Sequence, residues 1–218
     1  MTWHPMRNLL TTLALAALIS PLVLRADAGV LIPSNDSQPD PKKLSLEEMD
    51  IAIRIDNGVA RVSIRQIFAS HQSAVIEGKW IFALPNSATV SDFAVWDGVT
   101  RIPGVILERK RAGEIYENIT RQMIDPGLLQ MGEYGAEEAK RGAVFSAKVF
   151  PIPGYGFKRV EVEYHQRIPV ENLRSYFAVP LRPDAYRAQV AGRLGVTLDI
   201  TSQHPMSDFR LIGDTYSL

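Results

Sequence analysis

The stretch LSLEEMDIAIRIDNGVARVSIRQIF, residues 44–68, contains two runs of alternating side chains on either side of a tight-turn signal. Successive side chains of a β-strand point to opposite faces, so the first run places three isoleucines on one face: Ile51, Ile53 and Ile55. The turn signal is Asn57-Gly58, because both residues accept the positive φ angles of a two-residue turn. In the second run, apolar Val62 and Ile64 alternate with polar residues. The stretch therefore predicts a β-hairpin.

The stretch FKRVEVEYHQRIPV, residues 157–170, has the most regular alternation in the chain. Three side chains of one parity are apolar or aromatic and are expected to face a core: Val160, Val162 and Tyr164. Those of the other parity are polar and are expected to face water: Arg159, Glu161, Glu163 and His165. This pattern is typical of a strand in a sheet that packs on one face only.

Several further runs predict strands. Residues 74–85 are apolar on both faces, which is typical of a strand that is covered on both sides. Shorter runs follow over residues 90–96, 99–108, 143–149, 175–181 and 194–202, and the last places Val196, Leu198 and Ile200 on one side. Nine or ten short strands with regular turn signals predict a mainly β chain, either a sandwich or a barrel. We expect an antiparallel β-sandwich.

One segment has helical periodicity. In residues 108–120, beginning ERKRAGEIYENI, the apolar side chains Ile115, Tyr116 and Ile119 recur at helical spacing among charged residues. So short a helix is not stable alone in water. We therefore expect it to cap the β core by laying its apolar side on a sheet. Residues 127–142 are rich in glycine and charge, and a long loop with one helical turn over 136–140 is expected there.

The N-terminus resembles an export signal. Arg7 precedes the apolar run NLLTTLALAALISPLVL, and Ala26-Asp27-Ala28 has the small-x-small pattern of a cleavage site. We expect a signal peptide over 1–28 and a flexible leader over 29–43, with the processed chain in the periplasm, on the cell surface or secreted. The alternative is an uncleaved membrane anchor, for which the run is slightly short of the roughly 20 apolar residues that a span needs.

Composition excludes several classes of function. The chain has no cysteine, which excludes disulfides, thiol nucleophiles and zinc–thiolate sites. Removing Arg7, Arg25 and Asp27 from 24 basic and 24 acidic residues leaves 22 and 23, a net charge of −1. A nucleic-acid-binding protein would carry a basic excess or stripe, and neither is present.

Candidate catalytic groups are few and scattered. His71, His165 and His204 are far apart in the sequence, and a Gly-x-Ser-x-Gly nucleophile motif is absent. Glu161 and Glu163 share a strand face, but alternating glutamates are typical of a solvated face. We therefore expect no enzymatic activity, no catalytic or metal-binding residues and no cofactor. A hydrolase acting on carbohydrate or peptide through Glu161, Glu163 or His165 is the alternative.

Binding surfaces are a better prospect than a reaction site, because tyrosine and tryptophan often anchor interfaces. The pattern leaves three aromatic residues outward or on loops: Trp96, Tyr134 and Tyr155.

The order of several motifs resembles the VIT domain, named for vault protein and the inter-alpha-trypsin inhibitor heavy chains. These motifs are an aromatic strand ending in Leu84-Pro85, a strand around Phe93, a Gly104-x-x-x-Glu108 segment before Ala112 and Tyr116, the pair Leu128-Leu129, and a Phe145 strand leading through Pro151 and Pro153 to Tyr164. The resemblance covers roughly residues 44–180 and continues more weakly to 202. Within this family, the chain resembles bacterial proteins that are similar to those heavy chains.

The resemblance implies a non-catalytic β-sandwich interaction or adhesion module over 44–202, with 203–218 a tail leading toward a further domain. VIT domains usually precede a von Willebrand factor type A domain, which binds metal through Asp-x-Ser-x-Ser. The nearest string here is Asp199, Thr201, Ser202 and Gln203, which lacks the last serine, so no metal site is expected. The expected partner is a protein or that adjacent domain; the alternative is a structural subunit that self-associates through edge strands.

Overall fold

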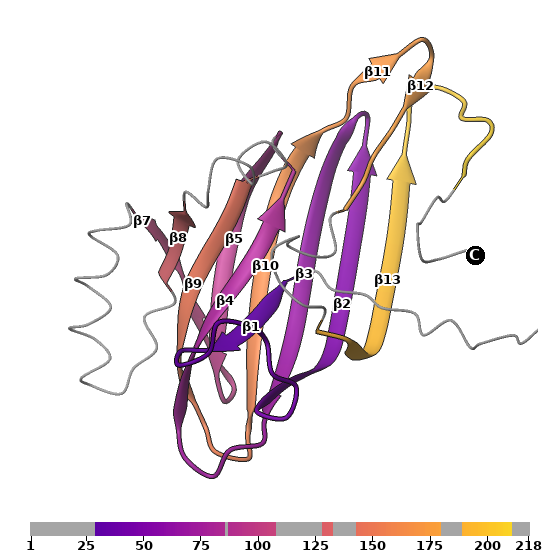
Figure 1. The fold of residues 1–218 in the computed structure, drawn as a ribbon. Helices are drawn as coiled ribbons and strands as arrows, with labels where there is room; N and C mark the ends of the chain where they lie inside the picture. Colours follow the sequence, from indigo (N-terminus) through magenta and orange to yellow (C-terminus); the bar gives the residue numbers. More distant parts are fainter. Residues whose placement is uncertain (1–28, 86, 108–127, 133–142, 180–188, 211–218) are drawn as a thin grey trace, which may run out of the picture.

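Figure 1 shows the computed structural model, which describes residues 29–85, 87–107, 128–132, 143–179 and 189–210. Thirteen strands lie in these residues: β1 (Val30–Pro33), β2 (Leu44–Asp56), β3 (Val59–Ser70), β4 (Ile76–Leu84), β5 (Ala88–Asp97), β6 (Thr100–Pro103), β7 (Val105–Leu107), β8 (Leu128–Gly132), β9 (Ala143–Ile152), β10 (Phe157–Arg167), β11 (Val170–Glu171), β12 (Arg174–Ser175) and β13 (Ala191–Thr201). The prediction of a mainly β chain is confirmed.

The strands form two large sheets. A six-stranded sheet has the order β13-β2-β3-β10-β5-β6, and a five-stranded sheet has the order β1-β4-β9-β8-β7. Most neighbours are antiparallel, as expected, but β13 runs parallel to β2 and β7 runs parallel to β8. A two-stranded ribbon, β11-β12, extends beyond the end of the larger sheet where β10 ends (Figure 1).

One apolar core joins the inner faces of the two sheets. Its largest side chains come from both layers: Trp80 and Phe82 from β4, Phe93 from β5 and Tyr164 from β10. The ring centroids of Trp80 and Phe93 are 5.4 Å apart, and those of Phe82 and Tyr164 are 6.4 Å apart. Aromatic pairs at such separations stabilise a core beyond the area that they bury. The described part of the chain is thus a β-sandwich.

The predicted hairpin over residues 44–68 is confirmed. Strands β2 and β3 pair in antiparallel register from Leu44 opposite Ser70 to Asp56 opposite Val59. Asn57 and Gly58 have φ angles of 45° and 84°, as the two-residue turn requires. The alternation predicted for β10 is also confirmed, since Val160, Val162 and Tyr164 are all buried.

The N-terminal segment differs from its prediction. Residues 29–43 were expected to be a flexible leader, but Val30–Pro33 form β1 and are buried. The backbone of β1 pairs with β4, and the buried amide of Gln189 accepts a hydrogen bond from Leu31 N–H at 2.9 Å. Val30, Ile32 and Ile81 form a second apolar cluster, so β4 is covered on both faces as expected.

Two other segments also differ. Residues 127–142 were expected to be one loop, but 128–132 form β8, which pairs with β9 and β7. Residues 175–181 were expected to be a strand, but only Arg174–Ser175 pair, as β12. The predicted helix over 108–120, with its residue Tyr116, lies outside the described residues. No helix in the described ranges is long and apolar enough to span a membrane.

Candidate functional site

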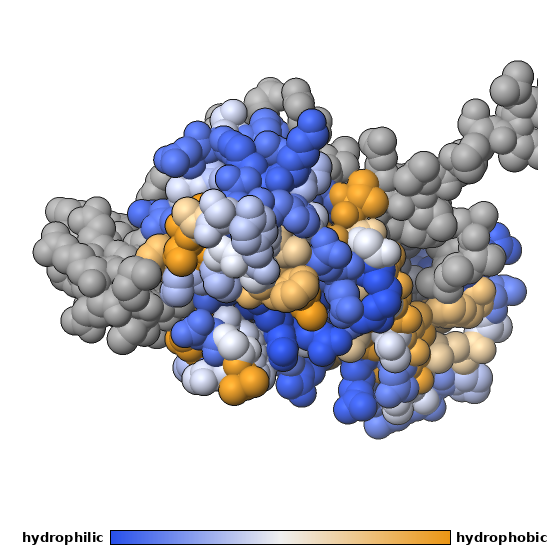
Figure 2. Space-filling model, turned by 90° about the horizontal axis from the view of Figure 1, so that it is seen from below, coloured by the Kyte–Doolittle hydropathy of each residue, from blue (hydrophilic) through white to orange (hydrophobic). Residues whose placement is uncertain are grey.

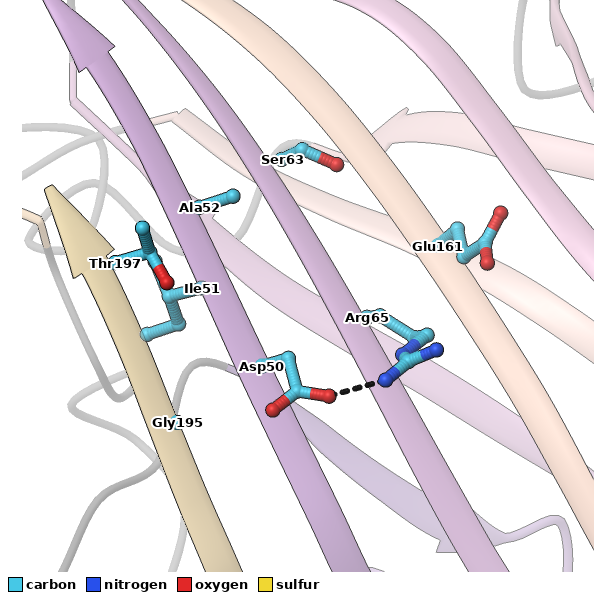
Figure 3. A pocket seen from close by; sticks show the side chains of 8 residues that line it. All are labelled: Asp50, Ile51, Ala52, Ser63, Arg65, Glu161, Gly195 and Thr197. Carbon is cyan, nitrogen blue, oxygen red and sulfur yellow. Dashed lines mark hydrogen bonds and ion pairs between the residues drawn. The ribbon is translucent and has the colours of Figure 1, made fainter. Parts of the chain in front are cut away.

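The outer face of the six-stranded sheet carries most of the polar residues that the sequence singled out. Strand alternation places apolar side chains on the inner face, so the charged side chains of β13, β2, β3 and β10 share the outer face. Register then aligns them in rows: Asp50 lies opposite Arg65, and Arg65 lies opposite Glu161. Figure 3 shows these side chains on neighbouring strands, with Arg65 directed toward Asp50.

Opposite charges meet along this face. Arg65 contacts Asp50, which also accepts a hydrogen bond from Arg193 at 3.2 Å. Further ion pairs cross neighbouring strands: Arg193–Glu48 at 2.8 Å, Arg61–Glu163 at 2.7 Å, Arg101–Glu161 at 3.5 Å, Arg54–Asp199 at 3.5 Å, and a close contact between Arg101 and Asp92. Exposed ion pairs stabilise a fold weakly, so their main effect is to balance charge across the face.

A depression of about 410 Å³ crosses this charged face. Its floor is low because the middle row has small side chains, Ala52, Ser63 and Thr197 (Figure 3). Asp50, Arg65 and Glu161 border it on one side. The depression brings carboxylates and hydroxyls together, but Ser63 has no hydrogen-bonded base among the described residues.

Two carboxylates of this face, Asp50 and Glu163, have a lowered pKa. The hydrogen bond from Arg65 lowers the pKa of Asp50 below its usual value, against a smaller opposing effect of burial. Burial alone would raise the pKa of Glu163, but hydrogen bonds from Arg61 and Ser91 outweigh it and the net pKa is lowered. A general acid at neutral pH needs a raised carboxyl pKa. Neither of these two residues meets that requirement.

The three candidate histidines, of the four in the chain, lie in separate places. His165, on β10, is in register with Arg61 and Thr89. His71 Nε2 lies 2.7 Å from Ser45 Oγ, which also donates to Glu47 Oε1 at 2.5 Å. A catalytic triad places histidine between serine and carboxylate, whereas here the serine lies in the middle. His204 is exposed in the segment that follows β13.

The other candidate residues are also placed. Asp199 pairs with Arg54, while Thr201 is exposed at the end of β13 and Ser202 and Gln203 follow it. Within the described ranges, no cluster of histidine, aspartate or glutamate could hold a metal ion. Trp96 is half-buried beneath Arg159, whose guanidinium lies 4.2 Å from the ring centroid. Tyr155 is 72% exposed, and Tyr134 lies outside the described residues.

A group of exposed apolar side chains at the β11-β12 end was not predicted from the sequence. Val170, Leu173 and Tyr176 on or beside this hairpin are 68%, 99% and 72% exposed, and Val59, the first residue of β3, is 46% exposed. We call these four residues the hairpin patch. The motif Glu171-Asn172-Leu173-Arg174 was a readable signal, because asparagine often begins a two-residue turn.

The hairpin patch lies where the chain leaves the sandwich. Ile168 N–H, just before β11, bonds Gly58 C=O at 2.8 Å, and Gln203 N–H, just after β13, bonds Asn57 Oδ1 at 2.9 Å. The two exposed side chains Met206 and Phe209 follow. Figure 2 looks at the opposite end of the molecule, where hydrophilic side chains predominate and hydrophobic ones form several smaller groups, the most extended of them along the right-hand side of the view.

Comparison with known proteins identifies one family. The family model of the vault protein inter-alpha-trypsin (VIT) domain matches residues 46–164, which is more than half of the chain. No curated protein sequence matches the chain.

Similar solved structures were also found. A Legionella pneumophila protein described as a candidate nutrient binding protein is 14% identical, with 66% of this chain and 44% of that chain covered and a TM-score of 0.40. A mutant of the M1 zinc metallopeptidase from Deinococcus radiodurans is 7% identical over 59% of this chain and 22% of its own, with a TM-score of 0.30. This chain spans less than half of either structure. Similarity at this level implies nothing about nutrient binding or peptide hydrolysis.

Proposed function

The chain belongs to the VIT domain family, and on this premise we propose that it is an exported, non-catalytic module that binds a protein partner. The observation that supports this most strongly is the hairpin patch. Single exposed apolar residues are normal, whereas contiguous exposed apolar patches mark interaction sites, and we infer that these four side chains form one.

Leu173 is the central residue of the proposed contact. Its φ of 61° lies in the left-handed region, which is unfavourable for a residue with a large side chain. The conformation turns a leucine fully into water at the tip of a projecting hairpin. Strained residues are concentrated at functional sites, and an exposed leucine that gains burial only on binding fits such a role.

We propose that the partner is a protein domain, with an adjacent von Willebrand factor type A domain as the most specific candidate. This choice is supported by the end of β13, which lies beside the β2-β3 turn, where Gln203 N–H bonds Asn57 Oδ1. The proposal of export is supported by the apolar N-terminal run and the Ala26-Asp27-Ala28 motif.

The non-catalytic role is supported by the outer face of the large sheet. Glu161 and Glu163 are both paired with arginines, and His165 has no hydrogen bond to either glutamate. A reaction centre would leave at least one such group available for a substrate. The balanced charges favour a solvated or docking face.

The experiment places a photo-crosslinking amino acid at position 173 of the full-length chain in the organism that makes it. The control position is Val99, in the β5-β6 turn, which is 92% exposed. We expect a defined cross-link from position 173, either to a separate protein or to a following domain of the same polypeptide, in an exported fraction and from a chain whose N-terminus is Gly29. No such cross-link is expected from position 99. Equal labelling, no adduct from position 173, or a cytoplasmic chain that keeps its N-terminus would contradict the proposal.

A second variant tests the non-catalytic role. The triple substitution Glu161→Gln, Glu163→Gln, His165→Asn should leave the adduct from position 173 unchanged. Loss of a measurable hydrolytic turnover in this variant would instead support the hydrolase alternative.

A further inference from the structure

The outer edge of β13 is the longest strand edge left without a neighbour in the described part of the chain. β13 has 11 residues and stands first in the six-stranded sheet, where only β2 pairs with it. The other edge strands are short: β1 and β6 have four residues each and end in proline, and β7 has three. Proteins commonly protect edge strands by shortness, proline or lysine. β13 contains neither proline nor lysine.

The two faces of β13 differ in a way that fits an added strand. Leu194, Leu198 and Ile200 are half-buried on the inner face, in line with the isoleucines of β2. Val196 shares this face but is 59% exposed, because it lies at the margin of the core. On the outer face Arg193 and Asp199 keep 55% and 59% of their side-chain surface exposed, although each already pairs within the sheet, Arg193 with Glu48 and Asp50 and Asp199 with Arg54. An added strand would therefore meet an apolar row on one face and two opposite charges on the other.

We propose that β13 pairs with β13 of a second copy of this chain, antiparallel about a two-fold axis at Val196. Directly opposite residues of an antiparallel pair share a face, and Arg193 and Asp199 are each three positions from Val196. Arg193 of each copy therefore meets Asp199 of the other. On the inner face, Leu194 meets Leu198, and the two Val196 side chains meet each other. The two six-stranded sheets become one continuous sheet.

Charge selects this register among the symmetric alternatives. A shift of the axis to Gly195 or Thr197 keeps the apolar residues on the inner face but separates Arg193 from Asp199. A two-fold pairing of identical edges closes at two copies, so it gives a dimer rather than a filament. The inference does not depend on export or on the partner of the hairpin patch, which lies beyond the end of the sheet.

Disulfide trapping tests the register directly. The chain has no cysteine, so the variant Val196→Cys can form only an intermolecular disulfide. In the proposed pair the two Cβ atoms at position 196 are about 4.5–5.5 Å apart, close enough to bond after a small adjustment. Two controls are Thr197→Cys, whose symmetry mates are diagonal at about 7–8 Å, and Val99→Cys at the opposite end of the sandwich. We expect oxidised dimer from Val196→Cys only.

Charge reversal tests the pairing without a cross-link. In sedimentation of the purified full-length chain, Arg193→Asp and Asp199→Arg should each weaken the dimer about tenfold, because each creates two like-charge contacts per dimer. The double reversal should restore dimerisation, since the charges again complement one another. Circular dichroism checks that each variant is folded.

Three results would overturn the proposal. The first is a wild-type chain that stays monomeric up to roughly 100 µM. The second is an equal yield of disulfide-linked dimer from Val196→Cys and Val99→Cys. The third is a double-reversal variant that dimerises as weakly as the single-reversal variants. A wild-type dimer that persists in Val196→Lys would also overturn it, because it would place the interface elsewhere.

Discussion

At the scale of single residues, Tyr164 places a polar hydroxyl in the apolar core. Its side chain is fully buried between the sheets, and its hydroxyl has no hydrogen-bond partner. Burial also raises the pKa of this phenol, so the group stays neutral. Burying an unpaired hydroxyl costs about 1–3 kcal/mol on scales from protein mutants. The ring therefore stabilises the core while the hydroxyl opposes it.

We predict that Tyr164→Phe leaves the free energy of unfolding unchanged or raises it by up to about 1 kcal/mol. The measurement is urea unfolding followed by tryptophan fluorescence. The matched comparison is Trp80→Phe, because Trp80 Nε1 donates to buried Gln66 Oε1 at 2.8 Å. Loss of this hydrogen bond in Trp80→Phe should lower the free energy of unfolding by about 1–3 kcal/mol or more. Destabilisation of Tyr164→Phe by as much as Trp80→Phe would mean that the hydroxyl has a partner in the folded protein.

The second residue-scale prediction concerns Asp50 and pH. The hydrogen bond from Arg65 lowers the pKa of Asp50 in the folded state, so folding is favoured while the carboxyl is ionised in both states. This contribution is present above the unfolded pKa of about 3.9 and is lost as the pH falls through the lower folded pKa. Asp50→Asn should therefore be less stable than wild type at pH 7, and the difference should shrink in acid.

The check is thermal unfolding of both proteins across that range of pH. Glu171→Gln, at an exposed position on the β11 strand, serves as the control for removing a carboxylate without an ion pair. A stability difference for Asp50→Asn that stays constant down to pH 2 would show that packing, rather than the charge, is responsible.

Alternation made the facing of individual residues predictable, but it did not predict their partners. Val160 and Val162 lie inward and Glu161 and Glu163 outward, as the period of two requires. That Arg65 meets Asp50 depends on the register of the hairpin, and that Arg101 meets Glu161 depends on strands about 60 positions apart. The candidate site was predictable as a polar face, whereas its ion pairs and depression follow from long-range pairing.

At the scale of elements, the β11-β12 hairpin combines a good turn residue with a poor one. Asn172 and Leu173 have φ angles of 50° and 61°, and the second position of such a turn strongly favours glycine. A left-handed leucine costs about 1–2 kcal/mol, and its side chain here gains no burial. The hairpin is therefore less stable than the same hairpin would be with glycine at position 173.

We predict that Leu173→Gly strengthens the isolated hairpin, by up to about 1 kcal/mol after the extra entropy of glycine in the unfolded chain is counted. The measurement is amide hydrogen exchange at Arg174, which pairs with Glu171 across the turn and should exchange more slowly in the variant. If the hairpin patch binds a partner, the same variant should weaken that complex. Gly58→Ala is the opposite case: the φ of 84° in the β2-β3 turn should make it destabilising by about 1 kcal/mol. Faster exchange in Leu173→Gly would contradict the turn argument.

Elements with an internal signal were predicted well, and those that depend on distant partners were not. The hairpin over residues 44–68 and strand β10 have both alternation and turn residues, and both are confirmed. β1 has only four residues after a glycine, and β8 lies in a segment whose composition is that of a loop. Each is a strand because a neighbour in the five-stranded sheet supplies its hydrogen bonds, which local composition does not reveal.

At the scale of the whole molecule, the layering into two sheets was predictable, but the order of strands was not. Alternating runs with turns between them favour a sandwich in general. The parallel contact between β13 and β2 joins residues about 145 positions apart, and no short motif indicates it. The same long-range closure brings Gln189 to the N-terminal strand, where its amide bridges Leu31 N–H and Leu44 C=O.

The N-terminal strand is thus a structural part of the sandwich, which leads to the last prediction. Val30, Leu31 and Ile32 are each at most 3% exposed, and burying each such side chain contributes about 1.5–3 kcal/mol. Their sum, roughly 5–9 kcal/mol, is comparable with the whole stability of a typical domain.

A chain that starts at Ser34 should therefore lose cooperative thermal unfolding and its near-ultraviolet circular dichroism, whereas a chain that starts at Gly29 should keep both. Leu31→Ala should lie between them, destabilised by about 2–5 kcal/mol. If the Ser34 chain instead unfolds cooperatively within about 1 kcal/mol of the Gly29 chain, β1 is dispensable, and the buried hydrogen bond between Leu31 and Gln189 does not stabilise the fold.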